Sequence, residues 1–357
     1  MKKRVVVAMS GGVDSSVTAA LLQEQGYEVI GVTMQLWDGH SSASGQLNAA
    51  DQDTGSKVVA EAQKVASQLN IPFHSFNLKE DFHRRVIDPF CDEYLNGRTP
   101  NPCVICNKFL KFGQLLDLAQ GLGGDFLATG HYVGLVYADG YFKIRKGVDR
   151  HKDQSYFLFA LNQNQLSKCL FPLGDMYKGQ VRDYAAQLNL SVAGKSESQD
   201  ICFIPDGDYS GFLQQERQVN SLSGDIVHVS GKVLGRHQGI YQYTVGQRKG
   251  LGIGWTEPLY VIAIDGEKQR LVVGEKQHLS RTELLVAECH WSIPLPDKPF
   301  PAYCRLRYRH TEMPAVIEPV ADGQVKVVFE SSQRGITPGQ AAVFYDGDLV
   351  IGGGWIV

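Results

Sequence analysis

The chain lacks long apolar runs, a strong net charge and a dense set of cysteines. Its 357 residues carry a formal net charge of −3, which argues against nonspecific coating of nucleic acid but leaves room for a local basic patch. No run approaches the roughly 18 apolar residues that a membrane helix needs. The apolar run after Met1–Arg4 is too short for a signal peptide. The sequence therefore predicts a cytoplasmic protein with no membrane partner.

The seven cysteines are sparse and odd in number, which argues against a disulfide framework in a chain of this length. Cys103 and Cys106 form a Cys-x-x-Cys motif, which serves metal binding, redox chemistry or packing. No second Cys-x-x-Cys is present, so no four-cysteine zinc site is spelled out locally, and we predict no metal ligands.

The surroundings of the motif predict how its thiols are presented. Pro100 and Pro102 favour a rigid, extended segment over Asn101–Cys103. Cys106 is expected just before a helix over 107–118. Because a helix N-terminus stabilises a thiolate, this position predicts a lowered pKa for the Cys106 thiol.

Strands and helices alternate in the first half of the chain. The apolar patterns predict strands over 5–9, 28–36, 71–77 and 126–130, and helices over 16–25, 57–69, 79–95 and 107–121. Pro89 should bend or break the third helix. Residues 38–56 are small and polar and indicate a loop, whereas 155–190 look helical. This order predicts an α/β fold, a Rossmann-like domain whose parallel sheet binds its ligand at the carboxyl ends of the strands.

The second half is richer in short alternating runs separated by glycine turns. Strands are expected over 225–229, 259–264, 270–274, 284–291, 302–309, 314–319, 324–329, 341–345 and 348–356. We therefore expect three domains: an α/β domain over 1–205, a small β-rich linker domain over 206–278 and a C-terminal β-barrel over 279–357.

A glycine turn, Ser10–Ser16, lies between the first expected strand and the first expected helix. Backbone N–H groups and the helix dipole hold an anion at such a place. Gly11 and Gly12 let the backbone approach a phosphate closely. Asp14 is unusual in an anion cradle and should have a cation or a backbone cap as its partner. No Gly-Lys-Ser/Thr follows, so the turn is not a Walker phosphate loop.

The turn resembles the PP-loop of ATP pyrophosphatases, enzymes that adenylate a carbonyl oxygen. This superfamily includes NAD, GMP and argininosuccinate synthetases and tRNA-thiolating enzymes. Over almost its whole length the chain is similar to the bacterial tRNA-specific 2-thiouridylase family. The similarity is carried by Ser10–Ser16, Asn101–Asn107, Ala128–Tyr132, Lys152–Tyr156, Ile201–Ile204, Tyr243–Arg248, Leu306–Tyr308 and Pro338–Gln340.

The resemblance implies ATP-dependent 2-thiolation of uridine 34 in the anticodon of the Lys, Glu and Gln tRNAs. ATP would transfer AMP to the C2 oxygen of the base, with release of pyrophosphate, and so make that oxygen a leaving group. Cys202 would carry a persulfide received from a cysteine desulfurase or a sulfur-relay protein. Cys106 would either release sulfide from that persulfide or resolve the intermediate as a Cys106–Cys202 disulfide.

The resemblance also assigns binding residues. For ATP, with Mg²⁺ inferred alongside it, they are Ala8, Met9, Ser10, Gly11, Gly12, Val13, Asp14, Ser15, Met34 and Gly130. For tRNA, through its anticodon stem-loop, they are Asn101, Pro102, Cys103, His131, Lys152, Asp153, Gln154, Arg307, Tyr308 and Gln340.

The residues themselves add one expectation about RNA. Arg305, Arg307 and Arg309 alternate along an expected strand, which would place them on one face as a basic stripe. Tyr308 would then lie on the opposite face of the strand.

One departure from the family keeps an alternative open. Cys103 stands where many relatives have an aspartate assigned to proton transfer, which puts that role in doubt. Cys103, Cys106 and Cys202 could instead meet around an iron–sulfur cluster if the fold brings them together.

Two other functions compete with thiolation. One is a PP-loop synthetase that amidates a small molecule, which needs neither Cys106 nor Cys202. The other is a non-catalytic RNA-binding protein with a vestigial loop, against which the intact Asp14 and Ser15 argue.

Overall fold

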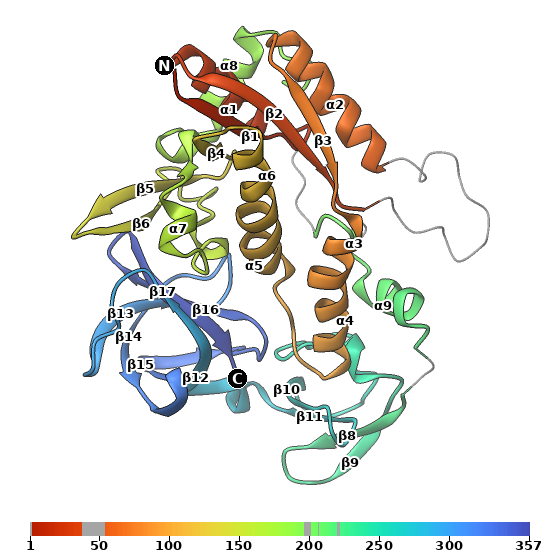
Figure 1. The fold of residues 1–357 in the computed structure, drawn as a ribbon. Coiled ribbons are helices and arrows are strands. Elements are labelled where there is room, and N and C mark those ends of the chain that lie inside the picture. The colour runs from red at the N-terminus through yellow and green to blue at the C-terminus, as the bar shows by residue number, and fades with distance from the viewer. Residues whose placement is uncertain (1, 38–53, 196–200, 206, 220–221) are drawn as a thin grey trace. The chain divides into compact units, whose positions relative to one another are not determined.

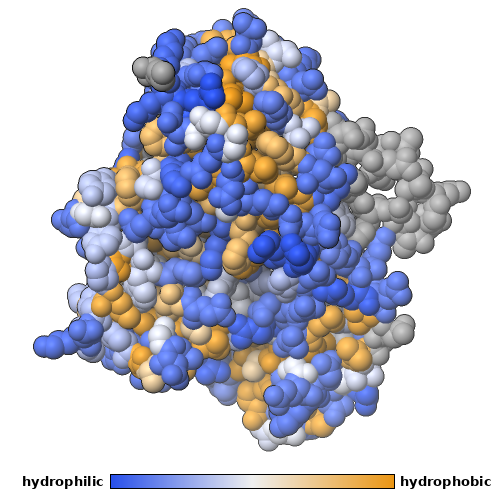
Figure 2. All heavy atoms as spheres, viewed as in Figure 1, coloured by the Kyte–Doolittle hydropathy of each residue, from blue (hydrophilic) through white to orange (hydrophobic). Residues whose placement is uncertain are grey.

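The computed structural model of the protein describes residues 2–37, 54–195, 201–205, 207–219 and 222–357 (Figure 1). The chain divides into two compact units. Unit 1 comprises Met1–Val86, Cys103–Pro205 and Asp348–Ile351, and unit 2 comprises Ile87–Pro102, Asp206–Gly347 and Gly352–Val357. None of the helices in the described ranges has the length and apolar character to cross a membrane. On the face drawn in Figure 2, hydrophobic surface occurs in small areas among hydrophilic ones.

The first half of the chain alternates between strands and helices. In order, the elements are β1 Arg4–Ala8, α1 Val13–Glu24, β2 Glu28–Gln35, α2 Thr54–Gln68, β3 Phe73–Asn77, α3 Lys79–Phe82, the π-helix η1 His83–Ile87, α4 Asp88–Leu95, α5 Pro102–Cys106, the π-helix η2 Asn107–Gln114, α6 Leu115–Gly121, β4 Phe126–Ala128, β5 Val133–Ala138, β6 Tyr141–Lys146, the 3-10 helix η3 Ser155–Phe157, α7 Gln163–Leu166, β7 Cys169–Leu170, the 3-10 helix η4 Pro172–Asp175 and α8 Lys178–Gln187.

Unit 1 is built on a parallel sheet of five strands in the order β3-β2-β1-β4-β7. Its central strand β1 is covered on both faces, because Val5, Val6 and Val7 have no exposed surface. Helix α1 packs against β1, β2 and α8, and Val17 and Val181 of these helices belong to the apolar core. This confirms the predicted Rossmann-like parallel sheet.

Several expected boundaries in unit 1 need correction. Helix α1 begins three residues earlier than the predicted 16–25, directly after the glycine turn. Of the loop expected over 38–56, residues 38–53 lie outside the described residues, and Thr54 already begins α2. The prediction of helix over 155–190 was wrong in part, since β7 adds a two-residue strand to the sheet. Such a strand is too short for its residue pattern to reveal it.

The helical run expected over 79–95 consists of α3, η1 and α4 in succession. Pro89 is the second residue of α4, which continues η1 without a break, so it lacks the N–H that would bond back into η1. The π-helix η1, whose hydrogen bonds join residues five apart, ends directly before α4. Pro89 therefore accompanies a change of winding and does not end the helix.

Unit 2 contains α4 and most of the second half of the chain. Its further elements are α9 Tyr209–Arg217, β8 Gly224–His228, β9 Val233–His237, the 3-10 helix η5 Ile240–Gln242, β10 Tyr260–Asp265, β11 Arg270–Gly274, the 3-10 helix η6 Lys276–Leu279, β12 Ser280–Trp291, β13 Phe300–Arg305, β14 Met313–Pro319, the 3-10 helix η7 Ala321–Gly323, β15 Val325–Arg334, β16 Ala341–Asp346 and β17 Leu349–Ile356.

The strands of unit 2 form a small sheet and a barrel. The sheet has the order β10-β11-β8-β9, around a core that includes Val261 and Leu271. The barrel follows the order β12-β15-β14-β13-β16-β17 and closes where β17 pairs with β12, with Ile356 opposite Val286. The predicted β-rich central region and C-terminal β-barrel are confirmed.

The basic stripe expected on strand 302–309 was wrong. Strand β13 ends at Arg305, and residues 306–310 form bends and a turn, so alternation along a strand no longer applies. Arg305 pairs with Glu312 and lies over the ring of Tyr345, 5.0 Å from its centre. Burial of this guanidinium side chain within the barrel wall explains why it does not contribute to an exposed stripe.

Candidate active site

The Ser10–Ser16 turn joins β1 to α1, and its own atoms brace it. Gly11 has a φ of +66°, a conformation that glycine adopts at little cost. Ser15 Oγ accepts the N–H of Ser10 at 3.1 Å and donates to the carbonyl of Gly12 at 3.2 Å. Gly12 caps the 12-residue helix α1 without a side-chain hydrogen bond. The first N–H groups of α1 are therefore left for an anion, as the sequence predicts.

Asp14 has the cationic partner that its place in the turn predicts. Its Oδ1 accepts a hydrogen bond from the Lys178 ammonium at 2.6 Å and another from the Tyr132 hydroxyl at 2.7 Å. The Lys178 side chain is only 11% exposed and lies over the ring of Tyr132. A buried ammonium needs a counter-charge, so Asp14 and Lys178 hold each other in place.

A second lysine reaches the turn from a distant part of the chain. Lys195 Nζ donates to the carbonyl of Gly11 at 3.0 Å and pairs with Glu61 of α2. Sequence analysis missed Lys178 and Lys195 alike. Asp14 indicated that a cation such as Lys178 should lie nearby, because its carboxylate needed a partner. Nothing in the sequence indicated Lys195.

The other predicted ATP-binding residues lie at the carboxyl ends of neighbouring strands. Met9 directly follows β1 and donates its N–H to Val32 of β2 at 2.7 Å, and Met34 lies near the end of β2. Gly130 follows β4 and approaches the turn so closely that a Cβ there would lie 2.9 Å from the Ser15 nitrogen. The structure thus brings this group together at one edge of the sheet.

The cysteine motif is helical, and two expectations about it were wrong. Pro102–Cys106 form helix α5, so Asn101–Cys103 is not an extended segment. Pro102 occupies the first helical position, where proline is well tolerated. Cys106 is the last residue of α5 and continues directly into η2, so it does not lie at a helix N-terminus.

The three thiols of interest belong to unit 1 and influence one another electrostatically. Burial raises the pKa of the Cys106 thiol to about 11, contrary to the expected lowering. Cys202 touches solvent, yet desolvation by the surrounding protein raises the pKa of its thiol to about 12. Desolvation also raises the pKa of Cys103, which keeps exposed surface. At neutral pH the thiol form of each is favoured.

Lys111 is the cation that opposes these shifts. Its charge lowers the pKa of Cys103, Cys106 and Cys202 against the larger effect of desolvation. Lys111 follows Cys106 by five residues, and the N–H of Leu115 bonds the carbonyl of Leu110 with that same spacing at the end of η2. Residues five apart lie closer to one face in a π-helix than in an α-helix, and η2 begins directly after Cys106.

His131 lies near the same lysine. It is 8% exposed, and its Nδ1 lies 2.6 Å from Thr129 Oγ1, with the rings of Phe112 and Phe171 beside it. Burial first, and then the charge of Lys111, hold the pKa of this imidazole well below its usual range. His131 is therefore neutral at physiological pH and able to donate or accept a hydrogen bond.

The predicted RNA-contacting segment Lys152–Gln154 is mostly engaged within unit 1. Asp153 is 3% exposed, and its carboxylate accepts hydrogen bonds from the N–H groups of Gly147 and Ser155 and from the Ser155 hydroxyl. Gln154 accepts the N–H of Tyr132 at 3.0 Å. These contacts give Asp153 and Gln154 a role in shaping the loop that carries Lys152.

Unit 2 contains the remaining predicted residues. Gln340 Nε2 donates to the carbonyls of Thr99 and Pro100, both at 3.0 Å, and so holds the chain just before Asn101 and Pro102. Gly339, with a φ of +89°, packs so closely on Thr99 that a Cβ would lie 2.9 Å from its carbonyl oxygen. The barrel thereby positions the residues that precede the cysteine motif.

Two more predicted residues lie in the turn that follows β13. Arg307 is exposed, and its guanidinium donates to the carbonyl of Gly335 at 2.6 Å. Tyr308 follows it in the turn and is half-buried. Arg307 is therefore anchored at one nitrogen and leaves others for an anionic partner.

The chemistry of the donor set bears on the iron–sulfur alternative. In the part of the chain that the structure describes, no group of three or more His, Cys, Asp or Glu side chains is arranged to hold a metal ion. The three thiols lie close enough to interact, but they are free cysteines without ligand geometry. The described residues therefore give this alternative no support.

Known domain families match all three parts of the chain. The tRNA methyl transferase HUP domain matches residues 3–206, the tRNA methyl transferase PRC-barrel domain matches 210–275, and the aminomethyltransferase beta-barrel domain matches 281–356. Fold and site together thus define a PP-loop protein of the HUP-domain class.

Relatives narrow this class to one family. The tRNA-specific 2-thiouridylase MnmA of Syntrophotalea carbinolica is 53% identical over 99% of this chain and 98% of its own length. Those of Geotalea uraniireducens and Geobacter metallireducens are 52% and 50% identical over 99% of this chain, covering 95% and 97% of their own lengths. The chain belongs to the tRNA-specific 2-thiouridylase family.

The solved structures that this chain resembles are less similar to it in sequence than these relatives are. An NMN synthetase from Francisella tularensis is 15% identical, with a TM-score of 0.34 over 55% of this chain and 67% of its own. The U34-tRNA thiolase NcsA from Methanococcus maripaludis, solved with its 4Fe-4S cluster, is 19% identical, with a TM-score of 0.36 over 60% of this chain and 66% of its own.

Proposed function

We propose that this protein is the sulfurtransferase that converts uridine 34 of tRNA to 2-thiouridine at the expense of ATP. The observation that carries the proposal is the presence, in one compact unit, of a pyrophosphate-type turn and a group of interacting thiols. The turn suits the activation of an oxygen by ATP, and the thiols suit its replacement by sulfur. The members of the family are named for this reaction.

The reaction balances in two halves. In the first, the C2 oxygen of uridine attacks the α-phosphorus of ATP, pyrophosphate leaves, and AMP becomes bonded to that oxygen. We propose that Ala8, Met9, Ser10–Ser15, Met34 and Gly130 bind ATP in this step. The unblocked N–H groups at the start of α1 support a site for the pyrophosphate moiety.

In the second half, Cys202 carries the sulfur as a persulfide. Either its terminal sulfur attacks C2 directly and Cys106 then attacks Cys202 Sγ, which breaks the S–S bond and leaves the sulfur on the base, or Cys106 first attacks Cys202 Sγ and releases hydrosulfide, which attacks C2. AMP then leaves with the original oxygen. In both routes the two cysteines end as a disulfide, which a two-electron donor must reduce before the next cycle. Lys111 would favour the anionic sulfur species, because its charge acts on both thiols.

For tRNA, we propose contacts from the residues that the family pattern indicates. Asn101, Pro102 and Cys103 would meet the target base, while His131, Lys152, Arg307, Tyr308 and Gln340 would contact the anticodon stem-loop. The exposed guanidinium of Arg307 and the buried neutral imidazole of His131 support these roles. Asp153 and Gln154 would act by shaping their loop, since the Asp153 carboxylate and Gln154 Oε1 already accept hydrogen bonds.

The proposal includes a division of labour along the chain. Residues 1–205 would bind ATP and perform the chemistry, 206–278 would link, and 279–357 would contact tRNA. A cysteine desulfurase or sulfur-relay protein would supply the persulfide, and Mg²⁺ would accompany ATP. We place this reaction in the cytoplasm, where tRNA is modified.

Transfer of labelled sulfur tests the proposal. The full-length protein is incubated with ATP, a cysteine desulfurase, radiolabelled cysteine and an unmodified tRNA with uridine at position 34. We expect label in the tRNA, and none when ATP is left out or when position 34 is cytidine. A Cys289→Ser variant controls for loss of a thiol outside the group. If no label reaches tRNA, the protein is not a tRNA thiolase.

A small-molecule amidating synthetase is not favoured. Such an enzyme has no use for Cys106 and Cys202, whereas here both thiols lie in the same unit as the turn. Equal consumption of ATP by the wild type and by Cys106→Ser and Cys202→Ser variants in the absence of any tRNA would favour that alternative.

A further inference from the structure

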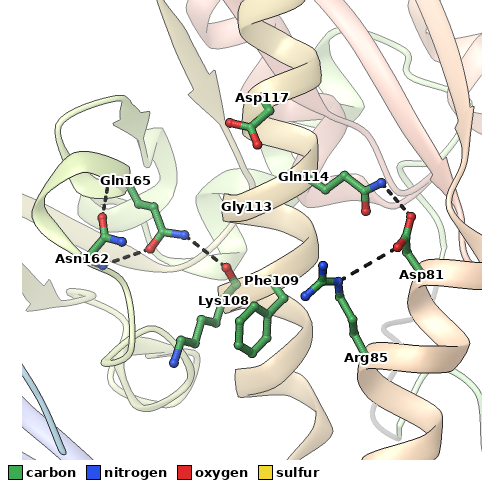
Figure 3. A pocket seen from close by; sticks show the side chains of 9 residues that line it. All are labelled: Asp81, Arg85, Lys108, Phe109, Gly113, Gln114, Asp117, Asn162 and Gln165. Atoms are coloured by element: carbon green, nitrogen blue, oxygen red, sulfur yellow. Dashed lines mark hydrogen bonds and ion pairs between the residues drawn. The ribbon is translucent and has the colours of Figure 1, made fainter.

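A pocket of about 450 Å³ in unit 1 lies apart from the residues assigned above (Figure 3). It is lined by Asp81, Arg85, Lys108, Phe109, Gly113, Gln114, Asp117, Asn162 and Gln165. Its size suits a ligand of one nucleotide, since small-molecule sites begin near 300 Å³.

The two walls of the pocket have an uncommon winding. Arg85 comes from η1, and Lys108, Phe109 and Gln114 come from η2, so both walls include π-helical segments. Such segments are rare and recur at functional sites. Gln165 Nε2 supports the second wall by donating to the carbonyls of Lys108 and Phe112, at 3.1 and 2.8 Å.

The pocket is on a different side of η2 from the thiols. Lys108, Phe109 and Gln114 line the pocket, whereas Lys111 acts on the cysteines and Phe112 packs beside His131. One helical segment thus presents the charge of Lys111 to the thiols and the ring of Phe109 to the pocket.

The floor of the pocket combines an exposed aromatic ring with two cations. Phe109 is 38% exposed. The Arg85 guanidinium lies 5.7 Å and the Lys108 ammonium 5.0 Å from the centre of its ring. Figure 3 shows these three side chains gathered on one side of the opening. A flat ring flanked by cations suits a nucleobase stacked on the ring with its phosphate beside the charges.

Polar atoms on the opposite side suit the edge of a base that carries an amino group. Gln114 Nε2 donates to Asp81 at 2.7 Å, which fixes the orientation of the amide. Among the described residues, no donor reaches the other amide atom, Gln114 Oε1, although it is buried. Asp117 adds an exposed carboxylate nearby. The unpartnered Gln114 Oε1 and the carboxylate of Asp117 are both acceptors, which favours an exocyclic amine; adenine, guanine and cytosine have one and uracil lacks it.

We propose that this pocket binds one unstacked nucleotide with an amino-bearing base, stacked on Phe109. With the function proposed above, that nucleotide would belong to the substrate tRNA and would anchor it away from uridine 34. A free nucleotide offers the same chemistry, so the test has an arm for each source. The pocket suits a single nucleotide better than several linked phosphates of an RNA backbone. Asp81 pairs with Arg84 and Arg85 and so offsets their positive charge.

Fluorescence titration of a Phe109→Trp variant tests occupancy of the pocket. The larger ring keeps the stacking surface and reports a stacked base by quenching. We expect quenching by an anticodon-arm RNA or by CMP that exceeds the quenching of the wild type, and much weaker quenching by UMP. Quenching by RNA, with or without quenching by CMP, assigns the pocket to tRNA, and quenching by CMP without any by RNA assigns it to free nucleotide. No added quenching by any of these probes overturns the proposal.

Steady-state thiolation by a Phe109→Ala variant tests the role in tRNA binding. Loss of one stacked base predicts a rise in KM for tRNA of about 5- to 100-fold with little change in kcat. Tyr137→Ala removes an exposed aromatic ring of the β5–β6 hairpin and should leave KM unchanged. If Phe109→Ala leaves RNA binding intact and instead slows persulfide transfer from the desulfurase, the pocket serves a protein partner and the proposal is wrong.

Failure here is distinguishable from failure of the proposed function. Cys202→Ser abolishes thiolation if the protein is a thiolase, whatever Phe109 does. Thermal unfolding of each variant, compared with wild type, separates a binding defect from loss of the fold.

Discussion

The glycine turn Ser10–Ser16 and the helical segment Pro102–Gln114, which lie in unit 1 apart from Pro102, differ in how far their local sequence determines their conformation. Ser10–Ser16 follows local rules: a buried strand, a glycine with positive φ, and serines that satisfy nearby backbone atoms. Pro102–Gln114 departs from them, with a helix that changes to π winding and thiols with raised pKa values. The turn is ready to bind an anion as it stands, whereas the thiols need a neighbouring charge to become reactive.

Loss of a thiol should give the largest effect and separate the two regions. We expect Cys202→Ser to reduce thiolation by at least about 10³-fold, because removal of a nucleophile leaves only binding and orientation. Isotope exchange between pyrophosphate and ATP in the presence of tRNA should persist, since the turn is intact. If thiolation and pyrophosphate exchange both fall in a Cys202→Ser variant that is folded, the turn and the thiols do not act separately.

Breaking the Asp14–Lys178 pair should affect the turn and not the thiols. Asp14→Asn leaves a mostly buried ammonium without its counter-charge, which we expect to cost about 2 kcal/mol in the free energy of unfolding. Urea denaturation measures this loss. Alkylation of Cys106 should be unaffected, and Asp183→Asn, in the same helix as Lys178, serves as the matched control.

The close approach of Gly130 to the turn predicts an effect of similar size. In Gly130→Ala the new methyl group meets the backbone of Asp14 and Ser15, which we expect to destabilise the fold by about 1–3 kcal/mol and to raise KM for ATP. Gly121→Ala, where a Cβ meets nothing within 4 Å, should be neutral or slightly stabilising. Similar KM values for ATP in both variants would contradict this account.

The raised pKa of Cys106 predicts a pH dependence with a definite sign. Below about 11, alkylation of Cys106 should speed up about tenfold per pH unit, as the thiolate fraction grows. Its folded-state pKa lies above the ordinary 9.0, so the folded state binds the proton more tightly and stability falls as pH rises from 9 to 11. Mass spectrometry after timed alkylation follows the rate. Lys111→Met should slow it, and Lys111→Arg should restore it.

Replacement of Arg307 should give the smallest effect. Arg307→Gln removes one charge from an exposed turn of unit 2, so we expect uniformly weaker tRNA binding and a salt dependence shallower by about one ion. Filter binding over a range of salt concentrations measures both. Arg334→Gln, another exposed barrel arginine, is the control, and an unchanged slope in Arg307→Gln would exclude a phosphate contact.

Sequence patterns predicted the parallel sheet, the turn and the barrel because these depend on short apolar runs and on glycine. The same patterns did not predict features that depend on single tertiary contacts. The π-helical hydrogen bonding of η2 is supported by Gln165, whose side chain bonds two backbone carbonyls of η2 and which lies 51 positions beyond Gln114. No local sequence pattern predicts such a contact. The pKa of Cys106 was predicted with the wrong sign, since burial outweighs any helix end.

Lys111 and Lys195 were missed for a related reason. Neither lysine stands out in its own stretch of sequence: Lys111 acts on Cys202 as well as on nearby Cys103 and Cys106, and Lys195 bonds Gly11 at the other end of unit 1's chain. The predicted basic stripe is the opposite error, in which a sequence pattern predicted a feature that the structure lacks. Because β13 ends at Arg305, Arg307 and Arg309 do not alternate along a strand with it.

The winding of η2 also restricts the length of the chain at this place. A π-helical turn holds one residue more than an α-helical turn with the same endpoints. Deleting a single residue between Cys106 and Lys111 would therefore let the segment relax to α winding while its two ends kept their positions. A second deletion, or an insertion, would turn Lys111 away from the thiols, so this stretch should tolerate the loss of one residue better than the gain of one.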